Sequence, residues 1–153
     1  MVQIDFYQIG QAGLEQVIMM LLKKTLAANQ RALVLCPMPA ASAIDTALWS
    51  HDPGSWIPHG LDDANGADYC HVWVSSDMAA NPINAGYLFL LHGSAPAKWT
   101  GFKRCFCLFD GKSDAQLQQA RNQWKVWQEL DEATFGYYAQ NAEGGWDKKL
   151  KFG

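Results

Sequence analysis

The chain has 153 residues, of which 49% are apolar and 18% are charged, and its formal net charge at neutral pH is -3. This composition predicts one globular domain, and it excludes a mini-protein and a disordered chain. No apolar run is long enough to span a membrane, and the N-terminus has no basic segment before an apolar run, so we expect a cytoplasmic protein. The acidic balance argues against strong direct binding to DNA.

The first part of the chain predicts alternating strands and helices. Residues 2–7 alternate between apolar and polar side chains, which predicts a strand, and an apolar stripe predicts a helix over residues 14–29. The continuous apolar run of residues 32–36 predicts a strand buried on both faces. Because proline lacks a backbone N–H, Pro37 and Pro39 are expected to end this strand.

A second helix is expected to begin near Ser42 and to reach Trp49. Ser42, with Asp45 three residues later, has the pattern of a capping box. The segment that follows, residues 51–68, holds two prolines and three glycines, which predicts a long loop. Long loops of this kind are often functional.

The second half of the chain predicts three more strands and a long helix. The apolar runs expected to form strands are residues 71–74, 87–91 and 104–109. Ser113 and Gln116 form another capping-box pattern, which predicts a helix over residues 114–130. The basic tail, about residues 140–153, is expected to be flexible.

This order of elements predicts an α/β fold. Strands that are apolar on both faces indicate a largely parallel central sheet with helices on each side. We therefore expect a three-layer α/β/α sandwich in a single domain covering residues 1–153. No internal repeat or linker divides the chain.

The cysteines are expected to be reduced core residues, because Cys36, Cys70, Cys105 and Cys107 include no C-x-x-C pair. The spacing suggests no metal site, no nucleotide-binding motif is present, and no cofactor is expected. An enzyme stays open as an alternative. In such a small α/β enzyme, Cys36 at the end of a strand would be the nucleophile and His59 would be its base. The Cys36 thiol would then react readily with an alkylating reagent.

The seven tryptophans are numerous for a chain of this length, and tryptophan is favoured on contact surfaces. The run ALWSHDPGSWIPHGL over residues 47–61 presents Trp49 and Trp56 on either side of a short proline link. This run, the opening strand, Asp45 four residues before Trp49, and the late helix carrying Arg121 together resemble the chi subunit of bacterial DNA polymerase III. The resemblance runs nearly end to end and is weakest over residues 61–84 and after Phe135.

The resemblance implies a non-catalytic accessory subunit of the clamp-loader assembly, with an α/β/α fold and two protein-binding surfaces. One surface would bind the psi subunit through the two aromatic side chains of Trp49 and Trp56, with Pro58 and His59 as scaffold and rim. Core packing stays open as the alternative for Trp49. An interaction module that serves a helicase through the same aromatic surface also stays open.

The second surface implied by the resemblance would bind the acidic C-terminal tail of single-stranded DNA-binding protein, a stretch of aspartates ending in Pro-Phe with a free carboxylate. Arg121 and Lys125 lie one helical turn apart, and Trp124 lies between that face and the apolar seam. The cations can pair with carboxylates, and the indole can form an apolar slot for the terminal phenylalanine. From the residues alone, a solvated cationic face above a core tryptophan is the alternative.

The chain departs from the family at two positions of this helix face. Relatives carry basic residues where this chain has Leu117 and Gln128. Fewer charges predict weaker and less salt-sensitive tail binding. Lys112 or the basic C-terminus from Lys148 to Lys151 could supply replacements.

Overall fold

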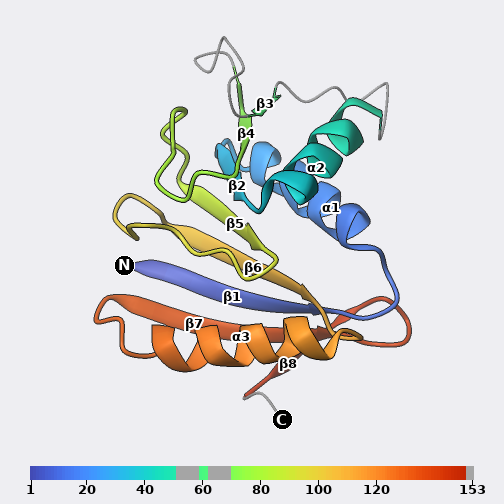
Figure 1. Cartoon of the computed structure of the whole chain (residues 1–153). Coiled ribbons are helices and arrows are strands. Elements are labelled where there is room, and N and C mark those ends of the chain that lie inside the picture. The colour runs from blue at the N-terminus through green and yellow to red at the C-terminus, as the bar shows by residue number, and fades with distance from the viewer. Residues whose placement is uncertain (51–58, 62–69, 151–153) are drawn as a thin grey trace.

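The computed structural model of the chain describes residues 1–50, 59–61 and 70–150. Eight strands and three helices are found in this part of the chain (Figure 1). They are, in chain order, β1 (Val2–Ile9), α1 (Leu14–Ala27), β2 (Ala32–Leu35), α2 (Met38–Ser50), β3 (His59–Leu61), β4 (Val72–Ser75), β5 (Tyr87–Leu91), β6 (Arg104–Asp110), α3 (Asp114–Trp127), β7 (Ala133–Gln140) and β8 (Trp146–Lys149).

The strands form one sheet in the order β3-β4-β2-β5-β6-β1-β7-β8. Neighbouring strands are parallel, except that β8 runs antiparallel to β7. Helices α1 and α2 pack on one face of the sheet, and α3 packs on the other (Figure 1). The predicted α/β sandwich with a largely parallel sheet is confirmed.

Two hydrophobic cores lie on the two faces of the sheet, and the strands in the middle contribute to both. In β2, Ala32 and Val34 face α1 and α2, whereas Leu33 and Leu35 face the side of α3, and all four have 0% of their surface exposed. A strand covered on both faces has no polar position. This is why residues 32–36 read as a continuous apolar run.

Helix α3 begins where its capping box predicts. Ser113 is the N-cap, and its hydroxyl oxygen accepts a hydrogen bond from the Gln116 N–H at 3.3 Å. The Gln116 side chain accepts a hydrogen bond from the Asp110 N–H at 2.9 Å, so it also holds the preceding turn. The helix ends at Trp127, three residues before the predicted end at Leu130.

The expected start of α2 is wrong, because the helix begins at Met38 rather than near Ser42. Pro39 lies in the first turn, where its missing N–H costs no intrahelical bond. The Ala41 N–H donates to the carbonyl of Pro37 at 2.9 Å, which closes the first turn. The Ser42 hydroxyl instead contacts the Met38 sulfur at 3.9 Å, so Ser42 is not a cap.

The structure adds strands that the sequence analysis did not place. The short strand β3 lies within the expected loop of residues 51–68, and the rest of that loop is outside the described residues. Two strands follow α3, and β8 lies within the segment expected to be a flexible tail. Strand β8 is an exposed edge strand with three charged residues in a row, Asp147 to Lys149, so it carries no apolar pattern that would predict it.

Candidate functional site

The C-terminal half of α3 carries an aromatic side chain, Trp124, between two basic residues in the sequence, Arg121 and Lys125. Trp124 is half-buried and packs edge-on against Phe6 of β1 and Phe135 of β7, with ring centroids 5.3 and 5.8 Å away. Arg121 is half-buried, and Lys125 is exposed. The Trp124 ring is therefore anchored in the core on one side and remains partly open on the other.

Both cations lie on the flank of α3 that faces β7 and β8. The opposite flank is held by Gln123, whose side-chain amide donates to the carbonyls of Gly93 and Ser94 after β5, at 3.0 and 3.1 Å. Residues two positions apart on an α-helix are separated by about 200°. Arg121 and Lys125 therefore point away from β5, toward the β8 edge of the sheet.

Two aromatic residues of β7 lie beneath this flank. Phe135 and Tyr137 share the α3 face of the sheet, and the Tyr137 ring lies 6.2 Å from that of Trp124. Burial raises the pKa of Tyr137, and the positive charge of Arg121 opposes this rise, which indicates that the two groups are neighbours. We call the group of Arg121, Trp124 and Lys125, with Phe135 and Tyr137 beneath, the α3 site.

The electrostatic character of the α3 site is cationic. Within the ranges that the structure describes, no ion pair involves Arg121 or Lys125. The structure thus brings together the three residues predicted to bind an acidic tail, and no ion pair of the described residues neutralises either charge. Phe135 and Tyr137 were not predicted from the sequence, because the apolar pattern of the strand that carries them is weak.

The two positions at which the resemblance leads us to expect basic residues lie beside the α3 site. Leu117 is half-buried and packs against the core on the α3 face, and Gln128 is the exposed C-cap of α3. Lys112 lies in the turn before α3, where its ammonium donates to the Gly10 carbonyl and lies 3.8 Å from Asp110 Oδ1. Arg121 is more than two helical turns further along α3, so Lys112 lies away from the α3 site.

The residues expected to bind psi are only partly described. Trp49 lies in the last turn of α2, and Trp56 and Pro58 lie outside the described residues. His59 is the first residue of β3, and its side chain is 1% exposed, with Nε2 3.3 Å from Asp45 Oδ1. The His59 side chain therefore lies inside the protein, where it supports the α2–β3 contact. Its part in a psi surface, with Pro58 as scaffold and rim, stays a prediction.

The alternative catalytic pair of Cys36 and His59 is not brought together. His59 is level with Val72 of β4, which is level with Ala32 at the start of β2. Cys36 follows the end of β2, roughly 13 Å further along the strand direction and about two strand spacings away across the sheet. The Cys36 residue is also 0% exposed. This geometry excludes His59 as a base for that thiol.

The four cysteines are buried and form no disulfide with one another, as the sequence predicts. Cys105 and Cys107 share the α3 face of β6, and burial raises the pKa of Cys107 to about 12 and that of Cys105 well above its usual value. No cluster of three His, Cys, Asp or Glu side chains within residues 1–50, 59–61 and 70–150 is placed to hold a metal. None of the helices described is both long and apolar enough to cross a membrane.

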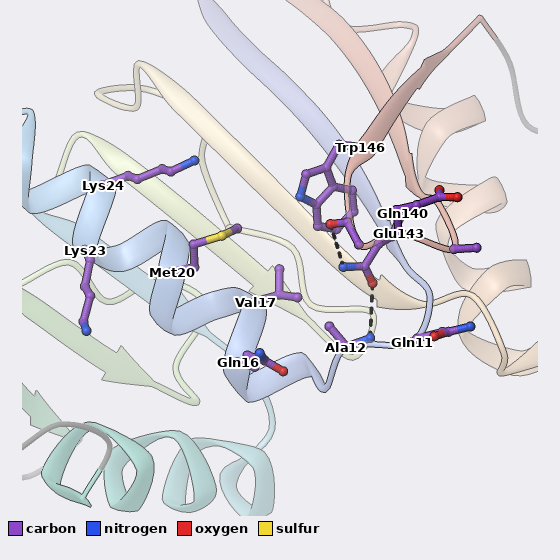
Figure 2. Close-up of a pocket in the computed structure, with 12 residues that line it drawn as sticks. Gln11, Ala12, Gln16, Val17, Met20, Lys23, Lys24, Gln140, Glu143 and Trp146 are labelled. Carbon is purple, nitrogen blue, oxygen red and sulfur yellow. Dashed lines mark hydrogen bonds between the residues drawn. The ribbon is translucent and has the colours of Figure 1, made fainter.

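A groove of about 850 Å³ lies on the opposite face of the sheet, between α1 and the β7–β8 turn. Figure 2 shows Met20 and Lys24 of α1 on one side and Trp146 of β8 on the other. Gln140 ties the two sides together, because its side chain accepts a hydrogen bond from the Ala12 N–H and donates one to the Gly144 carbonyl, both at 3.3 Å. The groove contains none of the predicted site residues.

These features define a class of protein: an α/β sandwich with a largely parallel sheet, in which the long helix on one face carries cationic and aromatic side chains. A sequence model of the family described as DNA polymerase III chi subunit, HolC, matches residues 1–134. The chain therefore belongs to the DNA polymerase III chi subunit family, an accessory subunit of a replicative polymerase, and its role is in DNA replication. No curated protein sequence matches the chain.

Proposed function

We propose that this protein is a non-catalytic adaptor of the cytoplasmic replication machinery. It binds the psi subunit on one side and the acidic C-terminal tail of single-stranded DNA-binding protein on the other. It thereby links the clamp loader to the coated single strand. Family membership supports the replication role, and the two partners are our inference.

The observation that carries the tail-binding half of the proposal is the composition of the α3 site. An acidic chain end with a terminal phenylalanine needs cations for its carboxylates and an apolar slot for its ring. Arg121 and Lys125 supply the cations, and Trp124 with Phe135 and Tyr137 supplies the apolar surface. Because the Trp124 ring is anchored by core contacts, the slot is formed before the ligand arrives, which lowers the entropic cost of binding.

Arg121→Ala tests this half of the proposal, because Arg121 is outside the core, whereas replacing Trp124 would also remove core packing. Tail-peptide affinity is measured by calorimetry from about 50 mM to about 300 mM sodium chloride. We expect Arg121→Ala to weaken binding about five- to tenfold at low salt and to flatten the salt dependence.

Lys24→Ala is the matched control, because Lys24 is an exposed cation of α1 on the opposite face of the sheet. It removes the same charge from the whole protein and should leave the affinity within about twofold of wild type. An Arg121→Ala affinity equal to that of Lys24→Ala would remove Arg121 from the site.

The psi-binding half of the proposal is supported by the placement of Trp49 at the end of α2, directly before the segment that carries Trp56. Co-elution of the chain with psi on size exclusion tests it. We expect a stable one-to-one complex with wild type and loss of co-elution with Trp56→Ala. Co-elution that survives the simultaneous replacement of both tryptophans by alanine would place the psi surface elsewhere.

A further inference from the structure

The hairpin formed by β7 and β8 sorts the basic residues of the C-terminus onto opposite faces of the sheet. In its antiparallel register, Tyr137 is opposite Lys149, and Tyr138 is opposite Lys148. Residues directly opposite each other in an antiparallel pair project to the same face. Lys149 therefore shares a face with Tyr137, and Lys148 shares a face with Tyr138.

The ring contacts show which face is which. Tyr137 packs against Trp124, so its face is the one covered by α3. Tyr138 stacks on Tyr7 at 5.2 Å, on the face that carries the groove of Figure 2. Lys149 is consequently on the side of the α3 site, and Lys148 is on the opposite side.

Lys149 is also level with Arg121 along the helix axis. The Trp124 ring lies between Phe135 and Tyr137, two residues of β7 that are about 6.6 Å apart along the strand. Since α3 runs antiparallel to β7, the Tyr137 end of this pair corresponds to the turn of α3 just before Trp124, which is the turn that carries Arg121. Lys149 lies one strand beyond Tyr137, on the flank toward which Arg121 and Lys125 point.

We propose that Lys149 is a third cation of the α3 site and that it faces Arg121 across Tyr137, so that the carboxylates of a bound acidic chain end lie between the helix and the β8 edge. This inference rests on the proposed function. It deepens that function by assigning the cation that compensates for Leu117 and Gln128. Lys149 lies beyond the part of the chain that the family model matches.

The surroundings of Lys149 fit this role. The residue is exposed, and no ion pair of the described residues involves it. Asp147 also projects to the α3 face, opposite Ala139 at the turn end of the hairpin, where its Oδ1 accepts a hydrogen bond from Asn141 at 3.3 Å. An acidic ligand should therefore approach from the open end of β8 and leave the Asp147 end uncovered.

Lys149→Ala and Lys148→Ala form a matched pair, because each removes one lysine from the same exposed strand and changes the net charge equally. The probe is a fluorescently labelled peptide of four aspartates followed by Pro-Phe with a free C-terminal carboxylate, and its affinity is measured by anisotropy at low salt. We expect Lys149→Ala to weaken binding about three- to fivefold and Lys148→Ala to change it by less than about 1.5-fold. Lys149→Arg should retain wild-type affinity.

The outcomes distinguish a failure of the role proposed for Lys149 from a failure of the proposed function. Equal effects of the two alanine variants, with wild type binding the peptide, would overturn the role of Lys149 and leave the proposed function standing. Failure of wild type to bind the peptide would overturn the proposed function. Circular dichroism on both variants checks that the substitutions in this exposed strand have not altered the fold.

Discussion

Asp5 is a carboxylate with 2% of its surface exposed, and its environment explains several residues around it. Arg104 Nη2 lies 2.8 Å from Asp5 Oδ2, and the Gln3 side chain donates to Oδ1 at 2.7 Å. A Cβ at position 136 would lie 2.4 Å from Asp5 Oδ1, so only glycine fits there on β7. Arg104 and Gly136 are far from Asp5 in the chain, and the register of β1 with β6 and β7 brings them together, so the sequence alone could not pair them.

Tyr7 provides a pH-dependent test of this environment. Burial, together with the charge of Asp5, raises its pKa from 10.0 to about 12. Below pH 10 the hydroxyl is protonated in both the folded and the unfolded chain, so its contribution to stability is fully present. Between pH 10 and about 12 only the unfolded chain ionises, so the free energy of unfolding falls as the pH rises.

We therefore expect Tyr7→Phe to lose less stability than wild type between pH 9 and pH 11. Urea midpoints at the two pH values measure this difference. The buried thiols of Cys105 and Cys107 have raised pKa values and act in the same direction, so part of the alkaline loss remains in the variant. Equal losses in wild type and Tyr7→Phe would contradict a partly buried Tyr7 whose hydroxyl stays neutral in this pH range.

Among the elements, α3 and α2 show when a capping-box pattern in the sequence predicts the start of a helix. Its capping box predicted the first residue, and the structure has the Ser113 cap that the pattern requires. The similar pattern at Ser42 failed, because the two prolines before it start the helix one turn earlier. A capping motif therefore predicts a start only where no earlier residue satisfies the same N–H groups.

Ser113→Ala and Ser42→Ala test this difference. We expect Ser113→Ala to reduce the free energy of unfolding by about 1 kcal/mol, because it removes an N-cap bond. Ser42→Ala should change it by less than about 0.5 kcal/mol, since Ser42 is an exposed helix residue and alanine has a higher helix propensity. Urea unfolding of the two variants measures both values. A larger loss at Ser42 than at Ser113 would reverse the assignment of the caps.

Strands β7 and β8 could not be predicted from the pattern of apolar and polar residues. Strand β7 carries Phe135 and Tyr137, which contact Trp124, but Gly136 between them and the polar end of the strand weaken its pattern. Strand β8 is stabilised by pairing with β7 rather than by its own apolar side chains. Consequently, the cations and the indole of the α3 site could be predicted, whereas the apolar floor and the place of Lys149 required the register.

For the molecule as a whole, the predicted layers were correct because the three helices carry apolar stripes and five of the strands carry either an alternating pattern or a continuous apolar run. The order of strands in the sheet was not predictable in this way, and it is the strand order that separates Cys36 from His59. It also places β7 and β8 beside α3, so that one face of the sheet carries the α3 site and the other carries the groove of Figure 2. The proposed function as an adaptor depends on this arrangement of the whole chain.

The central claim is that the α3 site recognises an acidic chain end by both its charge and its terminal ring. The most direct measurement is a calorimetric titration of wild type with the aspartate peptide ending in Pro-Phe and with the same peptide lacking the terminal phenylalanine. We expect the truncated peptide to bind at least about tenfold more weakly, because burial of a phenylalanine ring contributes about 1.5 kcal/mol or more. Equal affinity of the two peptides would contradict the claim, because charge alone would then account for the binding.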